Sequence, residues 1–119
     1  MEALTAFTRD HGVRAARLHG IGAFEDAELG FLDRERREYD RFRVDQETEV
    51  LSLLGNVSVT DQGPRVHAHV TLGRPDGSAV GGHLFEAHVA TTLELFVIRL
   101  GGELRRTHDE ATGAALLDL

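Results

Sequence analysis

Hydrophobic and polar residues alternate along most of this chain, as they do in β-strands with one buried face. Residues 2–11 differ, because Leu4 and Phe7 follow helical spacing and Gly12 suits a helix end. We predict a short amphipathic helix there, with Leu4 and Phe7 facing the core. From Val13 onward the period is two, and clusters of glycine, proline and aspartate separate candidate strands. These strands are expected at 15–24, 27–32, 38–44, 49–60, 65–73, 78–89 and 92–100, with weaker signals at 102–106 and 114–119.

This element order predicts an α+β fold in a single domain, residues 1–119. One helix precedes many strands without alternating βα units, which favours an antiparallel β-sheet of about seven strands, strongly curled, with the N-terminal helix packed against it. In the strand at 49–60, one face is polar and the other is expected to be apolar; the apolar residues are Leu51, Leu53, Val57 and Val59. Residues 95–98 are apolar on both faces, so this strand needs cover from the helix or from another subunit.

A hairpin with three histidines is the most informative feature of the sequence. Residues 75–77, Pro-Asp-Gly, suit a three-residue turn in which glycine takes the left-handed position. With this loop, His69 lies directly across from His83, and His67 is their diagonal neighbour on the same face. The apolar pattern supports the same register, because a shift of one residue would turn the apolar residues outward. These apolar residues are Val66, Ala68, Val70, Leu72, Val80 and Leu84.

Three converging imidazoles are typical of a metal site. His67, His69 and His83 are therefore candidate ligands for one divalent transition metal, with zinc as the first choice. Water, a carboxylate or a neighbouring subunit would complete the shell, and binding is expected to fail below about pH 6, where free imidazoles protonate. The alternative is a polar sheet face whose histidines contact only water or a partner. The remaining histidines, His11, His19, His88 and His108, are most simply surface residues.

Composition narrows the functional classes. The chain carries a net charge of −7, and its 13 basic residues are all arginine, which disfavours direct nucleic-acid binding. The pair Arg105-Arg106 is followed by acids and is interpreted as solvated surface. There is no cysteine, so any metal must be bound by histidine or carboxylate. No apolar run approaches the roughly 20 residues of a membrane span, and no signal or transit peptide is recognisable, so a cytoplasmic location is the default expectation.

Several segments resemble the plants-and-prokaryotes conserved (PPC or PCC) domain. They are 50–58 (VLSLLGNVS), 66–73 (VHAHVTLG), Asp76-Gly77 and 81–86 (GGHLFE), with further similarity at 13–23 and 106–119, where Asp109, Thr112 and Gly113 match the family's ending. The family usually has another strand before its first helix, and this chain begins at or inside that helix. The plant motif Arg-Phe-Glu-Ile-Leu corresponds to residues 47–51, which keep only the glutamate and the apolar pair.

The resemblance implies an antiparallel sheet with a helix against it, assembled as a homotrimer. In plant members an AT-hook binds the DNA minor groove, while the PPC domain mediates trimerisation and partner contacts. Prokaryotic members stand alone and are often labelled DNA-binding. This chain lacks an AT-hook: 73–75 (Gly-Arg-Pro) matches its core, but Leu72 and Asp76 flank it where basic residues are needed. A protein or DNA partner is thus an expectation from the family label, and direct DNA binding is doubted.

A cupin is a further interpretation of the histidine pattern. A cupin also uses His-x-His on a strand, but its motif needs a glycine six residues before the first histidine and a glutamate after the second. Here Gly63 is four residues before His67, and residues 73–74 are Gly-Arg. Three hypotheses follow: a homo-oligomeric module that binds a protein or DNA, a metal-binding protein with a structural or sensory site, and a metal-dependent enzyme with an open coordination position. No catalytic residue is assigned, and the balance is against an enzyme.

Overall fold

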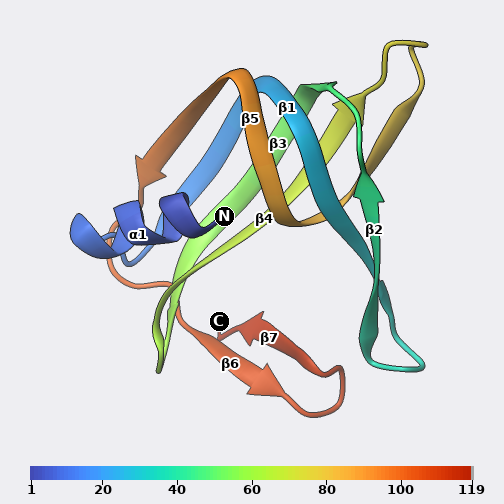
Figure 1. The fold of residues 1–119 in the computed structure, drawn as a ribbon. Helices are drawn as coiled ribbons and strands as arrows, with labels where there is room; N and C mark the ends of the chain where they lie inside the picture. Colours follow the sequence, from blue (N-terminus) through green and yellow to red (C-terminus); the bar gives the residue numbers. More distant parts are fainter. Residues whose placement is uncertain (119) are drawn as a thin grey trace.

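The computed structural model describes residues 1–118 and confirms the predicted α+β fold (Figure 1). Helix α1 (Glu2–Asp10) precedes seven strands. The strands are β1 (Ala16–Asp33), β2 (Glu38–Val44), β3 (Thr48–Thr60), β4 (Gly63–Gly73), β5 (Ala79–Arg99), β6 (Arg106–Asp109) and β7 (Ala114–Leu117). Within residues 1–118, no helix has the length and hydropathy that a membrane span requires.

The main sheet is antiparallel and closes on itself. Its strand order is β2-β1-β3-β4-β5, and β1 also pairs with β5, so β1, β3, β4 and β5 form a closed circuit. Strands β1 and β5 are each continuous, although the sequence pattern predicted two shorter strands in each place. The predicted division of each into two strands is wrong. The β1–β5 register shifts at several β-bulges, and these bulges interrupt the alternation of residues without ending the strand. The resulting bends are visible in Figure 1.

Helix α1 covers one side of the sheet with only part of its predicted apolar face. Leu4 packs against the hydrophobic core, as expected. Phe7 is 42% exposed and stacks on His11, so its predicted core position is wrong. The helix ends where the sequence predicted, because Gly12 adopts a left-handed φ of 60° just after the C-cap residue.

The core lies inside the closed sheet and is lined by alternate residues of its strands. Leu53, Val57 and Val59 of β3 are buried, as predicted, but Leu51 is 55% exposed. A register shift between Val50 and Ser52 explains this error, since the bulge turns Leu51 outward and Val50 inward. On the other face of β3, Ser58 is fully buried rather than solvated.

The C-terminal hairpin β6–β7 forms a separate two-stranded sheet. The strand expected at 102–106 is displaced, because β6 begins at Arg106, the last residue of that range. The tail strand expected at 114–119 is found at Ala114–Leu117, and Leu119 lies outside the described residues.

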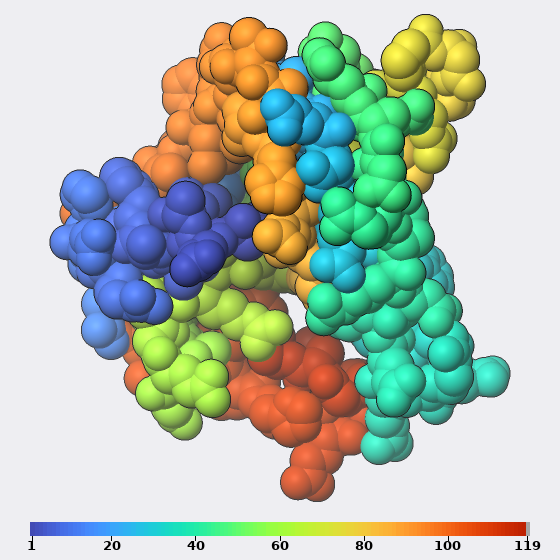
Figure 2. Space-filling model, in the orientation of Figure 1, coloured from blue at the N-terminus to red at the C-terminus, as the bar shows by residue number. Residues whose placement is uncertain are grey.

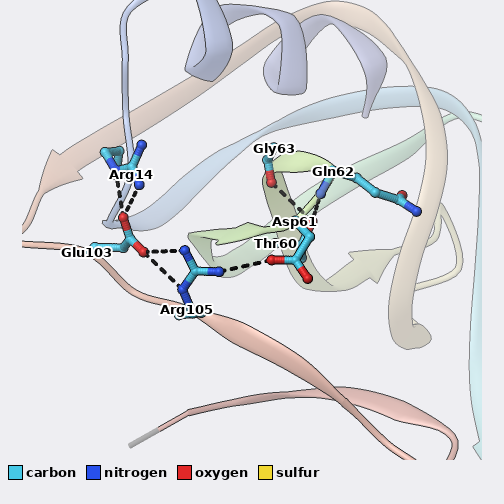
Figure 3. Close-up of polar contacts among 7 residues, drawn as sticks. All are labelled: Arg14, Thr60, Asp61, Gln62, Gly63, Glu103 and Arg105. Carbon is cyan, nitrogen blue, oxygen red and sulfur yellow. Dashed lines mark hydrogen bonds and ion pairs between the residues drawn. The ribbon is translucent and has the colours of Figure 1, made fainter.

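An exposed ion-pair chain ties the segment before β6 to the rest of the molecule (Figure 3). Glu103 bonds both Arg14 and Arg105, and Arg105 Nη1 also lies 3.1 Å from Asp61 in the β3–β4 turn. The backbone N–H of Val59 donates to the Leu104 carbonyl at 2.7 Å. These contacts place the hairpin beside the sheet, and Figure 2 shows the molecule hollowed between the hairpin and β2.

Candidate metal centre

The predicted hairpin register is confirmed. His69 pairs directly with His83, and Leu72 pairs with Val80. The loop closes as expected, since the N–H of Arg74 donates to the Ser78 carbonyl at 2.8 Å and Gly77 adopts a left-handed φ of 82°. The three histidines therefore leave the sheet on the face opposite the core.

The imidazoles of His67, His69 and His83 form a compact triad. Their ring centroids are 5.0–5.4 Å apart, and one ring nitrogen from each lies within 4.8 Å of the other two. His69 is exposed, whereas His67 and His83 are half-buried. The Nδ1 atom of His83 is buried and has no hydrogen-bond partner among residues 1–118, and coordination of a cation would satisfy it.

Burial holds two of the three histidines neutral. The pKa of His67 is lowered to about 4, chiefly by desolvation and next by the positive charge of Arg106. Desolvation also lowers the pKa of His83 to about 4, with His67 as the next cause. A neutral imidazole has a free lone pair, so both side chains are ready to bind a metal at physiological pH.

Arg106 of β6 lies directly beside the triad. It is only 9% exposed, so its interpretation as solvated surface is wrong. Its guanidinium donates to Ser58 Oγ at 3.0 Å, to Asn56 Oδ1 at 3.2 Å and to the Ala115 carbonyl at 2.6 Å. Nη2 also lies 3.1 Å from His67 Nδ1. Because arginine can only donate hydrogen bonds, Nδ1 of His67 is unprotonated. A cation that binds this nitrogen would take the place of the Arg106 hydrogen bond. Arg106 would keep its three hydrogen bonds to oxygen atoms.

An aromatic cluster supports His83 from the other side. Tyr39 of β2 lies 4.9 Å from the His83 ring, and Phe85 lies 4.6 Å from it. The guanidinium of Arg41 stacks 3.8 Å above Phe85. These contacts restrict the orientation of the His83 ring and contribute to its partial burial.

The triad lies at the wall of a cavity of about 600 Å³ between the main sheet and the β6–β7 hairpin. Sequence reasoning did not find this cavity or the roles of Arg106 and Tyr39, because they come from segments remote from the histidine hairpin. The turn of β6–β7 uses the expected family residues: Asp109 accepts from Thr112, and Gly113 has a φ of 71°.

The other histidines lie outside the triad. His88 is exposed and pairs with Asp26 at 3.0 Å, and His11 is exposed beside Phe7. His19 stacks on Phe96 on the outer face of the sheet. His108 is exposed, as expected, but it lines the same cavity as the triad.

Comparison with known proteins identifies the family. The Plants and Prokaryotes Conserved (PCC) domain matches residues 1–101, so the chain belongs to the PCC-domain family. This assignment removes the reason for considering a cupin. No curated protein matches the chain.

Solved structures of three similar proteins share this fold. The metal-containing protein AF0104 from Archaeoglobus fulgidus is 40% identical, with a TM-score of 0.91 over 99% of this chain and 84% of its own. A PPC protein from Pyrococcus horikoshii is 34% identical, with a TM-score of 0.91 over 99% of this chain and 82% of its own. A protein from Bacteroides thetaiotaomicron, named as a candidate DNA-binding protein, is 31% identical, with a TM-score of 0.94 over 98% and 82%.

Proposed function

We propose that this chain is a homotrimeric binding module in which His67, His69 and His83 hold one divalent transition metal per chain, with zinc as the first choice. The observation that carries the metal proposal is the triad, whose ligand atoms lie within 4.8 Å of one another. Three nitrogens of a tetrahedral zinc shell are about 3.4 Å apart, given zinc–nitrogen bonds of roughly 2.0–2.1 Å. Small side-chain rotations would close that difference. The 40% identical relative from A. fulgidus is described as metal-containing, which supports the proposal.

The trimer proposal is supported by the outer face of the sheet. Leu54 and Phe96 flank His19 on the neighbouring strands and are 53% and 59% exposed. Ile21 and Ile98 extend this apolar surface across β1 and β5. The helix does not cover these residues. The strand at 95–98 was predicted to need cover on both faces, and we propose that other subunits cover this outer face.

A metal-dependent enzyme is the second candidate, because an open coordination position beside a cavity is the arrangement of a catalytic zinc. The residues that line this cavity include no carboxylate that could act as a general base. We therefore propose binding rather than catalysis.

Metal content is the direct test. After zinc loading and dialysis, elemental analysis should give one zinc per wild-type chain, and His69→Ala should reduce affinity at least about tenfold because it removes one of three ligands. His69 is exposed, so its loss should leave the fold intact. His88→Ala on the same sheet and His11→Ala, both outside the triad, are the controls and should retain full zinc content.

Equal zinc content in wild type and His69→Ala would contradict the site. So would the absence of zinc from both proteins after loading, which would leave the triad as a polar sheet face.

A further inference from the structure

The cavity beside the triad has a charge opposite to that of the whole protein. Three arginines and four histidines line it, and its lining includes no aspartate or glutamate. The chain as a whole carries 20 acidic residues and a net charge of −7. Because opposite charges are interspersed over most of the surface, a wall without acids indicates a site for negative charge.

The arginines of this wall lack acidic partners. None of the ion pairs formed within residues 1–118 involves Arg34, Arg65 or Arg106. Arg106 is nine-tenths buried, and its hydrogen bonds go to neutral groups. A buried guanidinium without a counter-charge is costly, and a bound anion would compensate it.

A metal at the triad would increase the need for an anion. Three neutral imidazoles leave the full charge of a divalent cation uncompensated, and the ion would lie beside the positive Arg106. An oxyanion that contacts both would fill an open metal position and form charge-assisted hydrogen bonds with the guanidinium.

The remaining walls indicate that the ligand also has an apolar part. Phe31, Leu32, Ala114 and Leu116 also line the cavity. Its volume of about 600 Å³ lies in the range of sites for small organic molecules. An inorganic ion would leave most of this space unfilled.

We propose that the cavity binds a small organic oxyanion, a molecule with one carboxylate or phosphate group on an apolar body, whose oxygens bridge the metal of the triad and the guanidinium of Arg106. The proposal rests on the proposed metal site for the coordination of the anion. Arg65 and Arg106 provide attraction that does not depend on the metal.

Isothermal titration with benzoate and phenyl phosphate tests this proposal, and benzyl alcohol serves as the neutral analogue of similar shape. Zinc-loaded protein should bind at least one of the two anions about tenfold more tightly than the alcohol. The exposed Arg65→Gln variant should weaken anion binding severalfold, and Arg106→Gln, if circular dichroism shows it folded, about tenfold or more. Arg9→Gln, an exposed change on α1 outside the cavity lining, should leave anion binding unchanged.

The results separate this proposal from the metal proposal. Full zinc content with no anion binding at millimolar concentration would overturn the oxyanion site alone. Equal binding of anions and benzyl alcohol, or equal anion binding by wild type and Arg65→Gln, would also overturn it. If elemental analysis finds no zinc, the metal proposal fails, and titration of the metal-free protein decides whether the arginines bind the anion.

Discussion

At the residue scale, burial of His67 and His83 governs how the site responds to pH. The pKa of each is lowered to about 4, chiefly by desolvation, so neither carries a proton between pH 7 and pH 5. Zinc binding in this range should therefore release no more than one proton, and affinity should fall about tenfold or less per pH unit. Zinc dissociation constants measured by chelator competition at pH 7, 6 and 5 would check this.

A steeper loss would contradict the role of burial. If three free imidazoles competed with protons, affinity would fall much more sharply below about pH 6, as the sequence alone suggests. The metal-free protein gives a second readout. Because the folded pKa values lie below those of the unfolded chain, the unfolded state binds more protons as pH falls from about 6.5 towards 4, and the free energy of unfolding should decrease over that range.

The residues of the site were predictable to different extents. The triad follows from one hairpin, whose turn residues and alternation determine its register within a short stretch of sequence. Arg106 could not be found this way, because its burial depends on contacts with Asn56 and Ser58 from a strand far away in the chain. The unexplained polar face of β3, which includes these two residues, was the only signal for it.

At the scale of elements, Gly81 and Gly82 allow β5 to approach its two neighbours closely. A Cβ on Gly81 would lie 2.6 Å from the Val70 carbonyl oxygen of β4, and one on Gly82 would lie 2.8 Å from the Gly30 oxygen of β1. Side chains at these positions would push the strands apart. The two glycines thus position His83, which follows them, over the cavity.

Gly82→Ala should therefore lower the free energy of unfolding by about 2 kcal/mol, because the added methyl group overpacks two strands. Zinc affinity should also fall, since the displaced strand carries His83. Urea unfolding and zinc titration measure the two effects. Gly101→Ala is the matched control, because a Cβ at Gly101 meets no atom within 4 Å. Equal stability of both variants would show that the close approach at Gly82 is unimportant.

Element identity was easier to predict than element pairing. Turn residues located β2 and the β4–β5 hairpin accurately, because these signals are local. Closure of the sheet depends on pairs such as Leu18 with Val97, which are remote in sequence and which alternation cannot match. The bulge at Leu51 was missed for a related reason, since it appears only when β3 is aligned with β4.

At the scale of the whole molecule, the exposed apolar surface around Phe96 predicts self-association. Light scattering at micromolar concentration should give three times the chain mass of 13.1 kDa. Phe96→Glu should shift the mass towards a single chain, because it places a charge within the surface that would be buried. Gln62→Glu adds the same charge to an exposed turn and should remain trimeric. A wild-type mass near 13.1 kDa would contradict the trimer.

The overall charge leads to a prediction about DNA. The question arises because the similar protein from Bacteroides thetaiotaomicron is named as a candidate DNA-binding protein. Binding to duplex DNA depends on basic groups that displace counterions from phosphates, but this chain has a net charge of −7. Three of its 13 arginines, Arg34, Arg65 and Arg106, line the cavity, and its 20 acidic residues outnumber the arginines. We expect no binding tighter than about 1 μM at roughly 150 mM salt, measured by fluorescence anisotropy with a labelled duplex. A submicromolar dissociation constant that rises steeply with salt would contradict this, and testing Arg106→Gln would then show whether DNA uses the same arginine that we assign to a small oxyanion.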